Sequence, residues 1–116
     1  MTDRKKNPRV YLQDILDAIA KVETYASEGE HDFFKDGKTQ DAVIRQISIV
    51  GEAAAKLPAA LRAQHREIPW RQIIGMRNIV VHDYSETDLP MVWKVAERDL
   101  PALKKAIEKI VKTAED

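Results

Sequence analysis

The spacing of apolar residues is the feature that most limits how this chain can fold. Between Pro8 and Glu28, and again between Gln40 and Leu57, apolar side chains recur at steps of three and four residues. Such spacing gathers them on one face of an α-helix, whereas a half-buried strand alternates at every second residue. The two stripes consist of Leu12, Ile15, Leu16, Ile19, Val22 and Ala26, and of Val43, Ile44, Ile47, Val50 and Ala54. The sequence shows no useful strand-like alternation, so it predicts an all-α fold.

The segment between these two helices is expected to be a loop. The stretch from Gly29 to Lys38 is polar and contains two of the chain's four glycines, which interrupt helical periodicity. We expect Phe33 and Phe34 to pack back onto the core. Thr39 is then a suitable N-cap for the second helix, and Pro58 fits its end.

The second half of the chain predicts further helices. A short helical turn is expected from Ala59 to Glu67, followed by a third helix that opens at Trp70 and runs towards Val81. Asp88 is expected to cap a fourth helix that continues to the C-terminus and is kinked or split at Pro101. These segments favour an up-and-down four-helix bundle with an additional short helix.

Composition adds limits on class and location. The 116 residues suit one helical domain, spanning 1–116, and the chain has 44% apolar and 33% charged residues, as soluble folded proteins do. We expect a cytoplasmic protein without membrane contact, because no apolar run approaches about 18 residues and no secretory leader is recognisable. Cysteine is absent, which excludes disulfides, thiol nucleophiles and cysteine-bound zinc.

The charge balance bears on nucleic-acid binding. Nineteen basic and nineteen acidic residues give a net charge of zero, so the chain lacks the global basic field of proteins that coat nucleic acids. A local basic cleft is still compatible with this balance. Its candidate residues are Arg4, Lys5, Lys6, Arg9, Arg71 and Arg77.

Residues 75–84 contain the pattern Arg-Asn-x3-His-x-Tyr, formed by Arg77, Asn78, His82 and Tyr84. On a regular helix, two residues five apart point about 140° away from each other. Arg77 and His82 therefore form one site only if the helix ends or loosens near His82, or if a second copy of the chain completes the site. We expect both.

The residue types at these positions suit cleavage of RNA without a metal. That reaction needs a base for the ribose 2′-hydroxyl, an acid for the leaving oxygen and a positive charge on the phosphate. Histidine titrates near neutral pH, and the arginine fork matches phosphate oxygens. One His82 cannot act on both sides of the phosphorus at once, but two symmetry-related copies can, so a homodimer is expected.

Structural roles are the alternative for the same residues. Arg77 can form an ion pair with Glu52 or Asp83, His82 can favour a helix end through the dipole, and Tyr84 can be a packing residue. For Glu52, a role in orienting Arg77 and a purely solvated position are equally compatible with the sequence.

Other residues with chemical potential carry weaker signals. The spacing of His31 and His65 does not match a metal site, and we expect no metal and no cofactor. Trp70 and Trp93 lie at helical spacing beside apolar residues, which favours packing over stacking on bases.

The pattern resembles the signature of HEPN domains, specifically of the HepT-like toxins that pair with a minimal nucleotidyltransferase antitoxin. The resemblance extends to Gly51-Glu52-Ala53, Ile68-Pro69-Trp70 and Asp99-Leu100-Pro101. It implies a HEPN-like bundle in which Arg77 and His82, with Asn78 beside the arginine, cleave RNA. It also implies that the antitoxin silences the toxin by transferring AMP to Tyr84.

Two hypotheses about function follow. The first is a metal-independent endoribonuclease toxin, dimeric, with RNA as its substrate and the nucleotidyltransferase as its partner. The second is a non-catalytic helical dimerisation or interaction module that binds the same partner. A small-molecule enzyme ranks third, because the chain has no phosphate-binding glycine loop and no evident pair of carboxylates.

Overall fold

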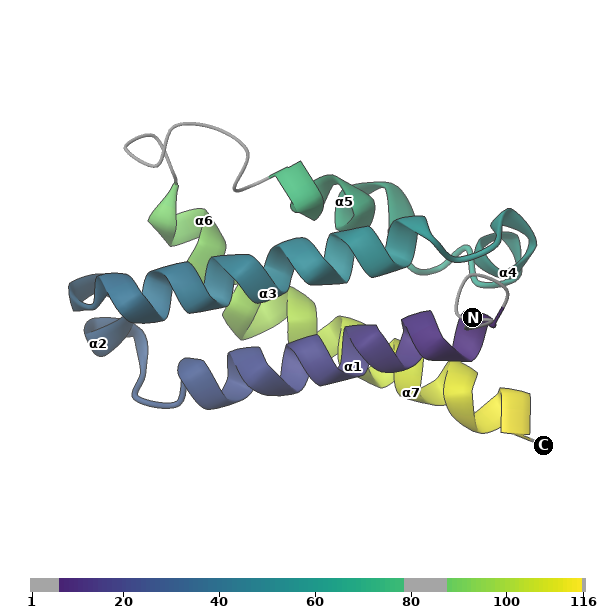
Figure 1. Cartoon of the computed structure of the whole chain (residues 1–116), viewed down its shortest axis with the longest axis horizontal. Coiled ribbons are helices and arrows are strands. Elements are labelled where there is room, and N and C mark those ends of the chain that lie inside the picture. The colour runs from purple at the N-terminus through teal and green to yellow at the C-terminus, as the bar shows by residue number, and fades with distance from the viewer. Residues whose placement is uncertain (1–6, 79–87, 116) are drawn as a thin grey trace, which may run out of the picture.

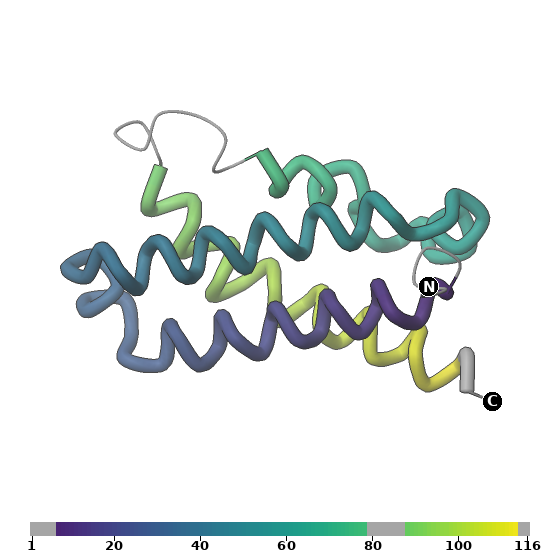
Figure 2. The backbone as a smooth tube through the Cα atoms, in the orientation of Figure 1, coloured from purple at the N-terminus to yellow at the C-terminus, as the bar shows by residue number. Residues whose placement is uncertain are grey.

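A computed structural model describes residues 7–78 and 88–115, and every regular element in these ranges is helical (Figure 1). The two long helices α1 (Pro8–Tyr25) and α3 (Gly37–Ala55) pack along each other. Helix α1 runs opposite to α3, and α7 (Leu100–Glu115) runs in the same direction as α3 (Figure 1). The start of α1 and the end of α7 therefore lie at the same end of the bundle (Figure 2). The expected all-α fold class is confirmed.

Helix α1 begins where the sequence suggests. The side chain of Asn7 caps the helix by accepting from the Arg9 amide at 3.0 Å, and Pro8 occupies the first turn, where an amide donor is not needed. The helix ends at Tyr25, three residues before the expected end. Gly29 follows with φ of 96°, a left-handed conformation that glycine adopts without steric cost.

The segment from Gly29 to Lys38 is not the expected loop, because residues 30–35 form the short helix α2 (Glu30–Lys35). Phe33 is buried on the core as expected, and its ring meets that of Phe34 edge-on at 5.2 Å. Phe34, however, is 37% exposed. A helix of fewer than two turns contains too few residues for its periodicity to be recognised.

The N-cap of α3 is Asp36, so the expectation of Thr39 was wrong. The carboxylate of Asp36 accepts from the Lys38 amide at 3.1 Å and from the Thr39 hydroxyl at 2.8 Å. The hydroxyl of Thr39 is the main reason that the pKa of Asp36 lies below its ordinary value. Thr39 therefore contributes to the cap as a donor to Asp36.

Two short helices follow α3. α4 (Ala59–Gln64) occupies the position of the expected helical turn, and α5 (Trp70–Gly75) begins at the expected tryptophan. The third helix was expected to run towards Val81, but α5 ends at Gly75 and the chain tightens into the 3₁₀ turn η2 (Met76–Asn78) directly after it; residues 79–81 lie outside the described ranges. Glycine is a weak helix former, and 3₁₀ geometry is common at helix ends.

The last helical segment is divided, as Pro101 suggested. Asp88 caps α6 (Leu89–Lys94) by accepting from the Met91 amide at 3.1 Å. A π-helical turn, η4 (Val95–Asp99), separates α6 from α7, and the Leu100 amide donates to the Val95 carbonyl, five residues earlier. Proline lacks an amide donor and its ring collides with the preceding turn, so a wider turn before Pro101 accommodates it.

The buried apolar side chains form one cluster to which α1, α3 and α7 contribute most of the residues. Ile15, Ile19, Ile47, Val50 and Ile107 are among those with no exposed surface. Across residues 7–78 and 88–115, none of the helices combines the length and apolar character that a membrane span requires.

Candidate functional site

The first two residues of the signature lie on the 3₁₀ turn η2 at the end of α5. Arg77 and Asn78 are both exposed. His82, Asp83 and Tyr84, together with the expected helix end near Val81, lie outside the described residues. The helix loosens at Met76, before the position that the sequence suggested.

The backbone of Arg77 is supported by two residues of α3. The hydroxyl of Ser48 donates to the Arg77 carbonyl oxygen at 3.2 Å. One turn further along α3, Gly51 is buried and lies so close to η2 that a methyl group on it would lie 2.5 Å from the Arg77 amide nitrogen. The main chain of Arg77 is therefore held at the surface of α3 while its side chain reaches solvent.

Neither residue was identified as functional from the sequence. Gly51 carried a signal, because a glycine within an apolar helical stripe often marks a close approach of two backbones. Ser48 carried none, since serines on helix surfaces are common and do not imply a long-range contact.

Glu52, the expected supporting residue, follows Gly51 and is exposed. Within the part of the chain that the structure describes, no ion pair joins Glu52 to Arg77. The side chain of Arg77 is consequently not neutralised by an acid of α3. Of the basic cleft residues, Arg71 is exposed on α5, whereas Arg4, Lys5 and Lys6 lie outside the described residues.

Comparison with known proteins identifies the family. The family described as "Ribonuclease HepT-like" matches residues 15–110 of the chain. The chain belongs to the HepT-like family. This membership confirms the resemblance noted in the signature and places the chain among ribonucleases of the HEPN type.

Two relatives show how far the HepT-like similarity extends. The "Probable ribonuclease HepT" of Thermococcus cleftensis is 40% identical over 93% of this chain and 99% of its own length. A protein of Methanocaldococcus jannaschii named "Gamma-glutamylcyclotransferase and putative RNase" is 41% identical over 92% of this chain. The chain spans only 49% of that longer protein. No solved structure matches the chain at a significant level.

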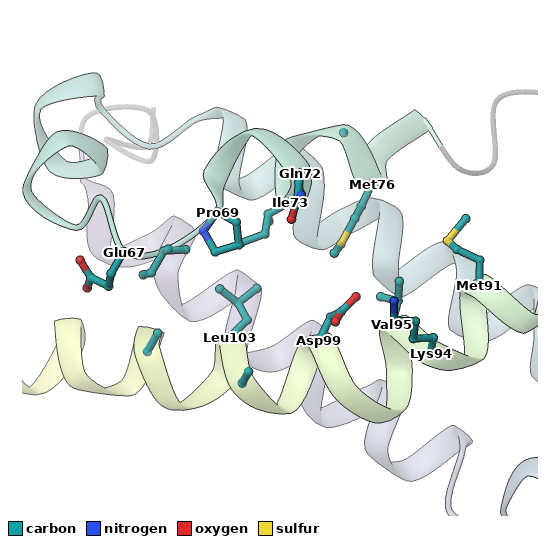
Figure 3. A pocket seen from close by; sticks show the side chains of 14 residues that line it. Glu67, Pro69, Gln72, Ile73, Met76, Met91, Lys94, Val95, Asp99 and Leu103 are labelled. Atoms are coloured by element: carbon teal, nitrogen blue, oxygen red, sulfur yellow. The ribbon is translucent and has the colours of Figure 1, made fainter.

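A groove of about 530 Å³ lies beside η2 in this HepT-like chain, between α5 and the α6 to α7 segment (Figure 3). Its lining is mainly apolar and includes Ile73, Met76, Met91, Val95 and Leu103. Met76 points into the groove, whereas the next residue of the chain, Arg77, is not part of the lining. The groove and the arginine are thus neighbouring but separate features.

The two tryptophans of the HepT-like chain serve packing. Trp70 is 8% exposed, and its indole nitrogen donates to the carbonyls of His65 at 2.9 Å and Arg62 at 3.2 Å. Trp93 is half-buried, with its ring 5.2 Å from that of Phe33. The interpretation of both as packing residues is confirmed.

A metal cluster does not occur in the described ranges. Among residues 7–78 and 88–115, no three histidine, cysteine, aspartate or glutamate side chains gather closely enough to hold an ion.

Proposed function

We propose that this chain is a metal-independent endoribonuclease toxin that uses Arg77 and His82, with Asn78 beside the arginine. The observation that carries the proposal is the exposed, unpaired position of Arg77 within the described residues, on a turn anchored to α3. An arginine held by its main chain, whose guanidinium has no acidic partner among the described residues, can receive a phosphate group without first breaking an ion pair to one of them. Membership of a ribonuclease family supplies the substrate class.

The reaction follows from the chemistry of the two side chains. One His82 accepts the proton of the ribose 2′-hydroxyl as the 2′-oxygen attacks phosphorus. The 5′-oxygen then leaves with a proton from the second His82 of a homodimer, so the products carry a 2′,3′-cyclic phosphate and a 5′-hydroxyl. Arg77 stabilises the additional negative charge that develops on the phosphate oxygens.

The same proposal includes control by a partner. A minimal nucleotidyltransferase antitoxin would transfer AMP from ATP to the hydroxyl of Tyr84 and release pyrophosphate. The adduct would bring a negative charge to within two residues of His82, where it repels RNA phosphate and obstructs the cleft. The toxin and its antitoxin would then form a pair in which modification silences cleavage.

The direct test is cleavage of RNA in excess EDTA by the wild-type protein and by Arg77→Ala and His82→Ala. We expect cyclic phosphate ends from the wild type, and loss of cleavage in both variants with unchanged circular dichroism. Arg98→Ala is the matched control, because Arg98 is an exposed arginine on η4.

Retained cleavage in His82→Ala would remove the mechanism. If none of the folded proteins cleaves RNA, the function is instead the non-catalytic interaction module, and the partner becomes the property to measure. Mass spectrometry of the protein after incubation with ATP and the nucleotidyltransferase tests the modification of Tyr84, with Tyr84→Phe as the unmodified control.

A further inference from the structure

The main chains of α3 and η2 approach each other so closely at Gly51 that a side chain at this position would not fit between them. A methyl group on Gly51 would lie 2.5 Å from the Arg77 nitrogen, 3.0 Å from the Ile73 oxygen and 3.1 Å from the Arg77 Cα. All three of these atoms belong to the main chain, so no side chain can rotate away to make room. Any residue larger than glycine at this position requires α3 and η2 to separate.

The need for glycine at this position is one of space. Gly51 lies in the interior of α3, where alanine is the better helix former, and its φ is not positive. By contrast, a methyl group on Gly37, at the start of the same helix, would meet nothing within 4 Å. The two glycines of α3 thus differ in what surrounds them.

Ser48 adds a directional contact on the same side of α3. Residues three apart on a helix share a face, so Ser48 and Gly51 both meet η2. The Ser48 hydroxyl donates to the Arg77 carbonyl oxygen at 3.2 Å, in the last described turn of this helical segment. One residue therefore allows the approach and the other fixes the carbonyl of the arginine.

We infer that Ser48 and Gly51 are positioning residues for Arg77 and set where its guanidinium meets the RNA phosphate. This inference rests on the proposed role of Arg77 in cleavage. Neither residue contacts the substrate, and both act through the backbone of η2. A displacement of a charged group by about 1 Å lowers the rate of an oriented reaction by as much as about 100-fold.

The experiment compares Gly51→Ala with Gly37→Ala, and Ser48→Ala with the wild type. Three quantities are measured: the melting temperature, kcat/KM for RNA cleavage, and Kd for a 2′-O-methyl RNA oligonucleotide that cannot be cleaved. We expect Gly51→Ala to lower kcat/KM by about 10- to 100-fold and Ser48→Ala by about 2- to 10-fold. Gly37→Ala is expected to match the wild type.

A second set of variants tests whether the effect passes through Arg77. In an Arg77→Ala background, adding Gly51→Ala or Ser48→Ala is expected to leave Kd unchanged, because the group that they position is no longer present. A merely structural role would weaken binding by the same factor in both backgrounds. Should Gly51→Ala fail to fold, the Ser48→Ala pair decides the matter.

The outcomes separate the inference from the proposed function. If Arg77→Ala abolishes cleavage while Gly51→Ala behaves like Gly37→Ala and Ser48→Ala like the wild type, positioning is refuted and the function stands. Equal losses in both backgrounds also refute positioning. If Arg77→Ala cleaves as the wild type does, the proposed function fails and the positioning role fails with it.

Discussion

Replacing Trp70 by phenylalanine tests how much the hydrogen bonds of its indole nitrogen, which connect α5 to the end of α4, stabilise the fold. The change keeps an aromatic ring in the core but removes the indole donor that bonds to the carbonyls of His65 and Arg62. Both carbonyls keep a main-chain donor, because the Ile68 amide donates to His65 and the His65 amide donates to Arg62, each at 3.1 Å. The cost is therefore that of one shared hydrogen bond, about 0.5 to 1.5 kcal/mol, and we expect a loss of about 1 kcal/mol. For a chain of 116 residues this corresponds to a melting temperature lower by about 4 °C.

Trp93→Phe is the matched control. The indole nitrogen of Trp93 is buried and has no hydrogen-bond acceptor among the described residues. Phenylalanine therefore removes a donor without breaking a bond, and we expect a loss of less than about 0.5 kcal/mol. Urea unfolding followed by circular dichroism at 222 nm measures both variants, and the tryptophan that remains in each gives a second signal.

One result for Trp70→Phe and Trp93→Phe would contradict this explanation. If Trp93→Phe loses as much stability as Trp70→Phe, the indole bonds do not account for the connection between α4 and α5.

Three further changes have expected outcomes. Ile47→Ala should lower the free energy of unfolding, measured in urea, by about 2 to 5 kcal/mol, because Ile47 has no exposed surface. A smaller loss would contradict tight packing around this side chain. The pKa of Asp36 is lower in the folded state than in the unfolded chain, so the stability that its carboxylate contributes is present above about pH 4 and is lost as the pH falls. Unfolding measured from pH 6 to pH 3 should therefore show a shallower loss of stability in Thr39→Val than in the wild type. Lys104→Ala removes the exposed 3.2 Å ion pair between Lys104 of α7 and Glu23 of α1. The free energy of unfolding should change by less than about 1 kcal/mol at low salt, and a larger loss would show that the pair is more than a surface contact.

Periodicity was sufficient to place the long helices and their buried faces. Ile15 and Ile47 were expected in the core and have no exposed surface. Local chemistry was ambiguous where several residues could perform one task. Asp36 and Thr39 are both good capping residues, and only the bond between them shows that the carboxylate is the cap and the hydroxyl its donor.

The site was predictable in part. The signature placed Arg77 on the third helical segment, and the structure describes it on the 3₁₀ turn at the end of that segment. The supports of Arg77 could not be derived from its neighbours in sequence, because the Ser48 contact spans 29 residues. Whether Glu52 and His82 act with Arg77 stays a prediction.

We expect the short elements that carry Arg77, α5 and η2, to open locally at a lower free energy than the long helices on which they pack. α5 and η2 pack mainly on α3, whereas α3 is also packed along the length of α1. Releasing α5 and η2 exposes less apolar surface than separating α1 from α3, so local opening requires less free energy than global unfolding. The amide hydrogens of η2 should therefore exchange with deuterium while those in the middle of α3 remain protected. Arg77 then belongs to a cooperative unit that can detach and return without unfolding the core.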